Sequence, residues 1–158
     1  MTVGLINCLF RWRHVLCGIV WIGMLYYVNF VQGGYFKEAS AEGLADAKAK
    51  LAPSALWWFR WGAMFTFITG LYLLHTISNV ISNYIIVGAV MGTWMAANVW
   101  VVIWPAQRIA LGIEAGGGTA AAGAEALLGS RTSPVFSGPV LVGTVTYTPL
   151  TRPAQAYW

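Results

Sequence analysis

Two histidines have the side-chain type and the positions expected of metal or haem ligands. His14 lies at the start of one long apolar segment, and His75 lies at the end of the next. If these segments form antiparallel membrane helices, both imidazoles reach the same membrane face at similar depth. Neutral imidazole is a good axial ligand for haem iron or another tetrapyrrole metal. The pair predicts a shared haem site; the alternative is that both are interfacial residues facing lipid headgroups.

A second group of polar and aromatic residues gathers at the opposite ends of the apolar segments. It comprises Asn29, Gln32, Arg60, Asn98, Trp104, Gln107 and Arg108. Arginine presents paired planar donors to a flat anion, amides both donate and accept hydrogen bonds, and an indole can stack on an aromatic ring. The group predicts a substrate site for a planar anion. The alternative is that these side chains satisfy one another, because unpaired polar groups are costly in lipid.

Other common catalytic patterns are missing from the sequence. It contains no Ser-His-Asp triad, phosphate-binding glycine loop or pair of catalytic carboxylates. Cys8 and Cys17 match neither the Cys-x-x-Cys-His spacing of covalent haem nor a zinc spacing, so we expect free thiols. The apolar segments carry no Asp or Glu, which argues against a carboxylate proton relay. The sequence assigns no catalytic residue.

The segments that must position these residues are long enough to cross a membrane. Of the 158 residues, 58% are hydrophobic and 9% are charged, against about 25% charged in soluble domains. Residues 61–107 contain no Asp, Glu, Lys or Arg, and this run is about twice the roughly 20 residues that one span needs. A polar break at 75–83 divides it into a hairpin. The sequence predicts an all-α integral membrane bundle with three transmembrane helices at about 11–32, 57–74 and 84–104.

The remaining segments complete a domain at 1–110 and a tail. The first span is expected to stay uncleaved and to end at Gly33-Gly34, a surface helix to cover about 37–51, Pro53 to open the second span and Pro105 to stop the third. Residues 111–131 predict a Gly/Ala-rich linker or weak helix. Residues 132–158 form an atypical C-terminal segment. Residues 132–151 could make a fourth membrane segment, although their Pro, Val and Thr content favours extended structure.

Small residues recur every four positions on the second and third predicted spans. The first stripe is Gly62, Thr66 and Gly70, and the second is Gly88, Gly92 and Ala96. In lipid, such stripes usually let two helices approach closely. We therefore expect both stripes to join the bundle, and the alternative is that a flat cofactor lies against the glycines.

The basic residues are scattered along the chain and indicate a membrane orientation. The net charge is +4, but no basic cluster suggests nucleic acid. More basic residues flank the ends of the spans near the 33–56 loop than flank the N-terminal ends. Because the more basic side usually faces the cytoplasm, we expect a multi-pass protein with a periplasmic N-terminus.

Three stretches resemble the membrane domain of the bacterial urate hydroxylase family, also called the urate oxidase N-terminal domain. They are residues 13–32 (RHVLCGIVWIGMLYYVNFVQ), 59–74 (FRWGAMFTFITGLYLL) and 92–108 (GTWMAANVWVVIWPAQR). The resemblance implies a bundle in the bacterial cytoplasmic (inner) membrane that oxidises urate. It also implies electron transfer to a cytochrome c, which is fused in longer relatives. Lacking the Cys-x-x-Cys-His motif, this chain is expected to be a short form that uses a separate cytochrome c. The family pattern carries onto His14, Trp21, Asn29, Gln32, Arg60, Asn98, Trp104, Pro105, Gln107 and Arg131.

Two hypotheses of different classes follow, and the sequence leaves open whether the chain is an enzyme. The first is a membrane redox component that binds haem or a planar anion such as urate. The alternative is a noncatalytic transmembrane accessory subunit that packs in a larger respiratory, oxygenase or photosynthetic complex. Either way, the small bundle is expected to associate with other membrane subunits or with copies of itself.

Overall fold

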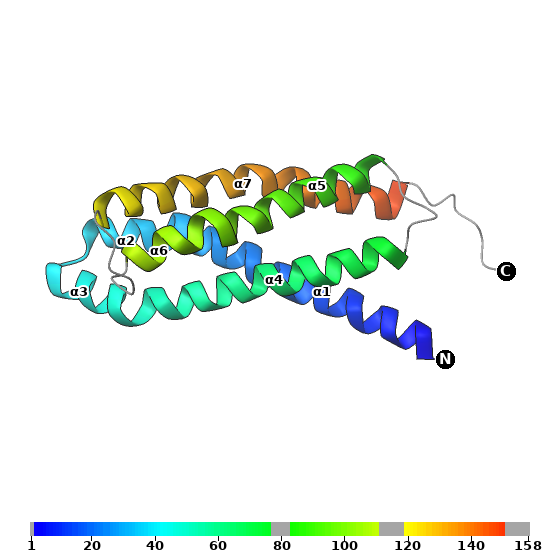
Figure 1. The fold of residues 1–158 in the computed structure, drawn as a ribbon, viewed down its shortest axis with the longest axis horizontal. Coiled ribbons are helices and arrows are strands. Elements are labelled where there is room, and N and C mark those ends of the chain that lie inside the picture. The colour runs from blue at the N-terminus through cyan, green and yellow to red at the C-terminus, as the bar shows by residue number, and fades with distance from the viewer. Residues whose placement is uncertain (1, 77–82, 111–118, 151–158) are drawn as a thin grey trace.

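The computed structural model is built from long helices that lie side by side (Figure 1). It describes residues 2–76, 83–110 and 119–150, so most of the predicted break at 75–83 lies outside the described residues. The elements are α1 (Thr2–Tyr26), η1 (Tyr27–Gln32), α2 (Gly33–Glu38), α3 (Ala41–Asp46), η2 (Ala47–Leu51), α4 (Ala52–Thr76), α5 (Asn83–Asn98), η4 (Val99–Ile103), α6 (Trp104–Ala110) and α7 (Thr119–Leu150). The η elements are π-helical turns inside longer helices. The described residues contain no strand, which confirms the predicted all-α class.

Two of these helical stretches are long and apolar enough to cross a membrane. They are Val3–Glu38 and Asn83–Ile109. They contain the first and third predicted spans, and each is longer than the prediction. That α4 or α7 also crosses a membrane stays a prediction.

The predicted end of the first helix at Gly33-Gly34 is wrong. Gly33 has φ −65° and ψ −34°, which is helical backbone, so the helix runs on to Glu38. It ends at Ala39, where ψ changes to 144°, and Ser40 then caps α3 by accepting a hydrogen bond from the Gly43 N–H. Glycine permits a left-handed turn without requiring one. From Ala41 the backbone stays helical to Thr76, so Pro53 does not open the helix either.

Pro105 does not stop the third helix, contrary to the prediction. Helix α6 carries the backbone on to Ala110. A proline ring normally clashes with the preceding helical turn and removes a donor. Here that turn, η4, is widened to π-helix, and the Trp104 N–H donates to the Val99 carbonyl five residues back. The wider turn accommodates Pro105 without ending the helix.

The preference for extended structure after residue 132 is also wrong, because α7 is one helix from Thr119 to Leu150. Pro134 has no N–H for the carbonyl of Ser130, four residues back. Asn29 of η1 replaces that donor, with its Nδ2 3.0 Å from the Ser130 oxygen. A neighbouring helix therefore satisfies the carbonyl that proline frees, as happens in membrane helices. The predicted linker is helical from Thr119, and residues 111–118 lie outside the described part.

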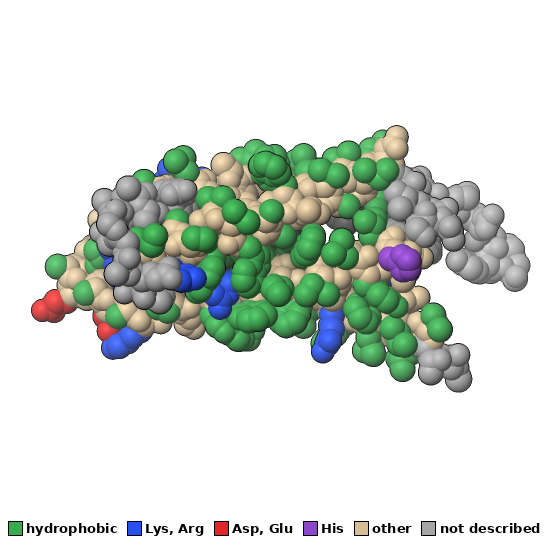
Figure 2. Space-filling view, in the orientation of Figure 1, with side chains coloured by type: hydrophobic (Ala, Val, Ile, Leu, Met, Phe, Trp, Pro, Cys, Tyr) green, Lys and Arg blue, Asp and Glu red, His purple; other side chains and the backbone are tan. Residues whose placement is uncertain are grey.

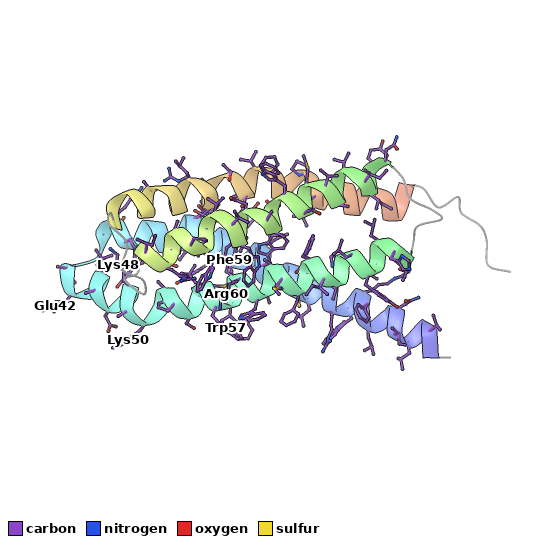
Figure 3. All side chains as sticks on the ribbon, viewed as in Figure 1. Glu42, Lys48, Lys50, Trp57, Phe59 and Arg60 are labelled. Carbon is purple, nitrogen blue, oxygen red and sulfur yellow. The ribbon has the colours of Figure 1, made fainter. Side chains whose placement is uncertain are left out.

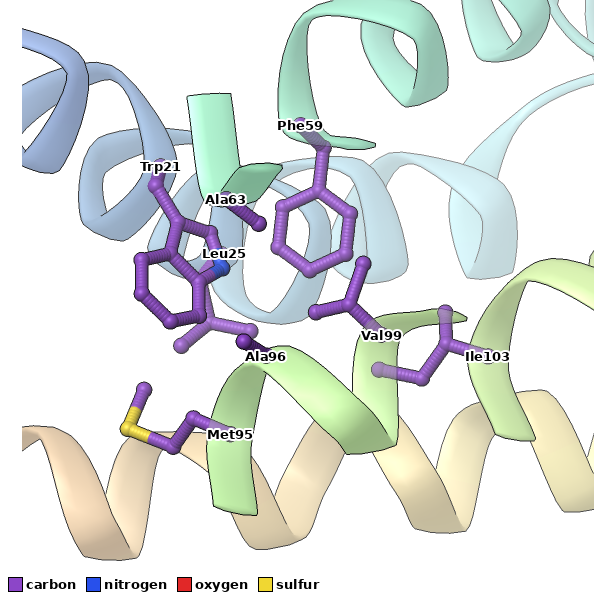
Figure 4. Packing of buried hydrophobic residues seen from close by; sticks show 8 residues of the cluster. All are labelled: Trp21, Leu25, Phe59, Ala63, Met95, Ala96, Val99 and Ile103. Atoms are coloured by element: carbon purple, nitrogen blue, oxygen red, sulfur yellow. The ribbon is translucent and has the colours of Figure 1, made fainter. Parts of the chain in front are cut away.

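An apolar core joins α1, α4, α5 and η4. Figure 4 shows Trp21 and Leu25 of α1 facing Phe59 and Ala63 of α4, with α5 and η4 on the other side. The buried residues on that side are Met95, Ala96, Val99 and Ile103. Helix α4 packs mainly on α1, and α7 packs mainly on α5 and α6. The core thus holds two helix pairs together.

The two glycine stripes have different surroundings. At Gly62, an added Cβ would lie 3.2 Å from the backbone nitrogen of Trp21, so the first stripe meets α1 closely, as predicted. At Gly88 and Gly92, an added Cβ would meet no described atom within 4 Å. Only Ala96 of the second stripe is buried in the core. The prediction that the second stripe joins helices is therefore wrong at its two glycines.

On the visible face, acidic side chains gather at one end of the molecule, whereas Lys and Arg side chains are spread along it (Figure 2). The acidic side chains visible in Figure 2 lie at the end that carries α3, and hydrophobic side chains cover much of the remaining length. Asp46 and Lys50 form an ion pair at the predicted four-residue spacing. Large hydrophobic side chains are exposed along the helices, among them Val3, Trp12, Ile19, Trp94 and Val101.

Candidate functional site

Arg60 is the centre of an aromatic cluster between α4 and the α5–η4–α6 helix. It lies on α4 beside Phe59, in the half of the helix nearer α3 (Figure 3). Its Cζ is 3.7 Å from the centroid of a Trp104 ring, 5.6 Å from Trp100 and 5.7 Å from Trp61. The Arg108 Cζ is 5.8 Å from the Trp104 centroid. Two guanidinium groups therefore share one indole, and a cation over an indole face is held by the ring quadrupole.

Two polar groups of this cluster are buried without hydrogen-bond partners among the described residues. They are the Nε of Arg60 and the Nε1 of Trp61. The helices that carry the cluster contain no Asp or Glu, and no described carboxylate lies within ion-pair distance of Arg60. Buried donors without partners are rare in folded proteins and call for a ligand or water. An anion would supply acceptors for these two donors.

The predicted anion-binding residues do not all lie in this cluster. Arg60, Trp104 and Arg108 are together. Gln107 is half-buried one residue before Arg108, and Gln32 is buried with its Oε1 unpaired among the described residues. No contact among the described residues links either glutamine to Arg60, so their part in the site stays a prediction.

The two predicted asparagines hold α7 in place. Asn29 Nδ2 donates to Ser130 O, and the Ser130 hydroxyl donates back to Asn29 Oδ1 at 3.2 Å. Asn98 Nδ2 donates to Gly129 O at 2.8 Å and to Ser133 Oγ at 3.0 Å. The alternative interpretation, in which polar groups satisfy one another across helices, describes both amides. Substrate binding by these two residues stays a prediction.

His14 is fixed against α4 through one of its ring nitrogens. Its Nδ1 is 3.0 Å from the Thr66 carbonyl oxygen and 3.1 Å from Thr69 Oγ1. Because a carbonyl only accepts, Nδ1 carries the hydrogen, and the neutral imidazole then has its lone pair on Nε2. An added Cβ at Gly70 would lie 3.0 Å from His14 Cε1, so glycine is what lets the ring fit here. A backbone bond at one nitrogen is also how proteins orient an imidazole that ligates through the other.

His75 is in a different setting. It is exposed in the last turn of α4, five residues beyond Gly70. Within the described part of the chain, no contact joins it to His14. Haem ligation by the pair therefore stays a prediction. The contacts of His14 are compatible with it, and the described contacts of His75 give it no support.

An apolar cavity of about 310 Å³ lies beside His14. The C-terminal half of α4 and the N-terminal half of α5, which diverge in Figure 1, form its main walls. His14 and Trp21 of α1 and Val140 of α7 complete the described lining. Gly70 of the first stripe lines it, and so do Gly88 and Gly92 of the second, where an added Cβ would meet no described atom within 4 Å.

Sequence reasoning missed several residues that build these sites. Trp100 lies one helical turn before Trp104, and Trp61 follows Arg60, so their spacing alone could have placed them in the aromatic cluster. The four-residue spacing of Thr66 predicts a packing stripe, and no sequence signal marks its carbonyl as the partner of His14. Ser133 belongs to the predicted atypical C-terminal segment, and its contact with Asn98 depends on α7 being a helix.

Comparison with known proteins gives a match to one family. Residues 78–146 match the family model described as urate oxidase N-terminal, which confirms the family resemblance predicted from the sequence. The matched region covers α5, η4, α6 and most of α7, and thus Trp104 and Arg108. No curated protein and no solved structure matches the chain.

Proposed function

We propose that this chain is a multi-pass protein of the bacterial inner membrane that binds urate, or a closely related planar anion, for oxidation. Its cluster of Arg60, Trp104 and Arg108 is the proposed binding site. The observation that carries the proposal is the pair of guanidinium groups on the Trp104 ring, with the buried Arg60 Nε unpaired among the described residues. The family match adds the chemical class of the anion.

The chemistry of urate suits these side chains. Near neutral pH urate is a flat, aromatic monoanion with carbonyl and ring-nitrogen acceptors. A guanidinium group can donate two parallel hydrogen bonds to such an edge, and an indole face can stack on the ring. Trp61 Nε1 offers a further donor from the same turn of α4. The protein side chains would orient the anion and offset its charge, while electrons leave to a separate cytochrome c.

Membrane residence is supported by the exposed apolar surface. Val3, Trp12, Ile19, Trp94 and Val101 are each more than 60% exposed. Large exposed apolar surfaces are rare on soluble monomers, whereas lipid solvates such side chains. We propose three or four transmembrane helices with the N-terminus in the periplasm, so that Arg60 and Arg108 lie towards the cytoplasmic side.

Urate-dependent reduction of added cytochrome c tests the redox part of this proposal. Membranes from cells that produce the chain should reduce cytochrome c when urate is added, and membranes without the chain should not. Arg60→Gln should abolish most of this activity, because it removes the guanidinium charge and leaves a shorter, neutral polar side chain. Equal reduction by membranes with and without the chain would rule out the redox function.

A second candidate function is a noncatalytic accessory subunit of a larger membrane complex. The observation that favours it is the exposure of Trp57, Trp58 and Trp94, at 50%, 55% and 66%, because tryptophan is enriched where proteins meet. Native mass spectrometry of the chain extracted in mild detergent separates the two functions. A stoichiometric complex with other subunits, and no urate binding by the isolated chain, would favour the accessory role over the first proposal.

A further inference from the structure

The apolar cavity beside His14 has a shape and lining that fit a small ring compound. Its volume of about 310 Å³ is at the lower end of the range of small-molecule pockets, about 300–1,000 Å³. Gly88 and Gly92 lie one turn apart on α5 and leave the part of that wall between Tyr84, Ile85, Ala89 and Thr93 without side chains. A flat ring could therefore lie directly against the backbone of α5, while Phe67 of α4 lines the other side.

The free ring nitrogen of His14 gives the described cavity lining a hydrogen-bond acceptor of fixed position. His14 uses Nδ1 to donate to the Thr66 carbonyl, so the lone pair of the neutral ring is on Nε2. No described residue hydrogen bonds to that nitrogen. A half-buried acceptor in an apolar lining favours a ligand that donates a hydrogen bond, since leaving the acceptor unmet costs free energy.

The cavity also opens towards the apolar outer surface of the bundle. Leu71 and Tyr84, which line it from α4 and α5, are 50% and 58% exposed. Their exposed neighbours Ile68, Val87 and Val90 are apolar as well. A compound dissolved in the lipid phase can reach such an opening, whereas a strongly charged one cannot.

These features point to one chemical class of ligand. We infer that the cavity binds the ring of a lipid-soluble hydroquinone, with one ring hydroxyl donating a hydrogen bond to His14 Nε2. An acyl chain of a lipid fits the apolar walls equally well but leaves the His14 acceptor unmet. A quinone in its oxidised form carries only acceptors and cannot satisfy His14 either. The inference concerns a site separate from the Arg60 cluster and does not depend on urate binding there.

The test uses the full chain in phosphatidylcholine nanodiscs and tetramethylhydroquinone as the probe. Isothermal titration should give one site per chain. The dimethyl ether of the same ring, which has no hydroxyl to donate, should bind at least tenfold more weakly, and so should the oxidised quinone. His14→Phe should reduce hydroquinone affinity about tenfold and remove the difference between the hydroquinone and its ether, because it keeps an aromatic ring but loses the acceptor.

Glycine variants supply a matched control for the position of the site. Gly92→Leu places a side chain in the cavity and should weaken binding at least tenfold. Gly23→Leu is the control, because Gly23 also has no described atom within 4 Å of an added Cβ but does not line the cavity. Thermal unfolding midpoints of the two variants should agree, which shows that Gly92→Leu is folded. If Gly92→Leu does not fold, Gly88→Leu replaces it in the same comparison.

Several results would overturn the inference. Absence of hydroquinone binding by the wild-type chain would leave the cavity to lipid chains. Equal affinity for the hydroquinone and its ether would remove the role of His14, and equal affinity of the Gly92→Leu and Gly23→Leu variants would place the ligand elsewhere. A haem absorption band in the purified protein, lost in His14→Ala, would show that iron occupies Nε2 instead.

Discussion

Replacing Gly62 with alanine should destabilise the helix pair that positions Arg60, two residues earlier on α4. The added Cβ would lie 3.2 Å from the Trp21 backbone nitrogen and 3.3 Å from Val20 Cγ1. The backbone nitrogen cannot rotate away, so α1 and α4 must separate. Overpacking of this kind costs about 1–3 kcal/mol, and the better helix propensity of alanine returns about 1 kcal/mol. Gly62→Ala should therefore lose up to about 2 kcal/mol of stability.

Gly92→Ala is the matched control for this prediction. Its added Cβ would meet no described atom within 4 Å, so only the helix-propensity gain of up to about 1 kcal/mol applies. Unfolding of both variants by SDS in mixed micelles, followed by circular dichroism, measures the difference. We expect Gly92→Ala to be the more stable variant by about 1–3 kcal/mol. Equal stabilities would show that α1 and α4 do not cross closely at Gly62, and the placement of Arg60 would lose its structural basis.

Three further substitutions test individual contacts. Asn98→Ala should weaken the packing of α7 on α5 by about 1–2 kcal/mol in the same SDS titration, because interhelical hydrogen bonds in membranes have this magnitude. No change in stability would show that the bonds from Asn98 to α7 are not formed. Gly70→Ala would place a Cβ 3.0 Å from His14 Cε1 and should displace the imidazole ring, so the ¹⁵N chemical shift of His14 Nδ1 should change. An unchanged shift would contradict the close fit of the ring against α4. Tyr26→Phe removes the 3.2 Å hydrogen bond to Ser137 Oγ. It should cost under about 1.5 kcal/mol of stability, since Ser137 keeps its hydrogen bond to a backbone carbonyl; a larger loss of stability would mean that the Tyr26 hydroxyl has partners beyond Ser137.

The sequence predicted helical class and the main apolar segments well, because long runs without charge leave few other folds. It failed where proline and glycine were treated as stop signals. Pro105 lies behind a π-helical turn, and Gly33 has ordinary helical dihedral angles. Pro134 is tolerated because Asn29, from a distant part of the chain, donates to the freed carbonyl. Single-residue propensities cannot include a partner supplied by a distant helix.

The candidate sites were predicted in part for a similar reason. The shared position of Arg60, Trp104 and Arg108 followed from their places at helix ends. The use of Asn29 and Asn98 in packing α7 could not be predicted, because it depends on α7 being a helix. The open space at Gly88 and Gly92 could not be predicted from their spacing either. A stripe of small residues has the same sequence pattern whether it packs against a helix or lines a cavity.

Direct measurement of urate binding tests the central proposal. Equilibrium dialysis with radiolabelled urate should be carried out on the chain in nanodiscs, on Arg60→Gln and on Arg11→Gln, which removes an exposed arginine far along α1 from the cluster. A hydrogen bond to a charged group contributes about 1.5–3 kcal/mol, which corresponds to at least tenfold in affinity. The wild type and Arg11→Gln should bind one urate per chain with similar affinity, and Arg60→Gln should bind at least tenfold more weakly. Equal urate affinity of all three proteins, or no binding by any of them, would contradict the assignment of the Arg60 cluster as the urate site.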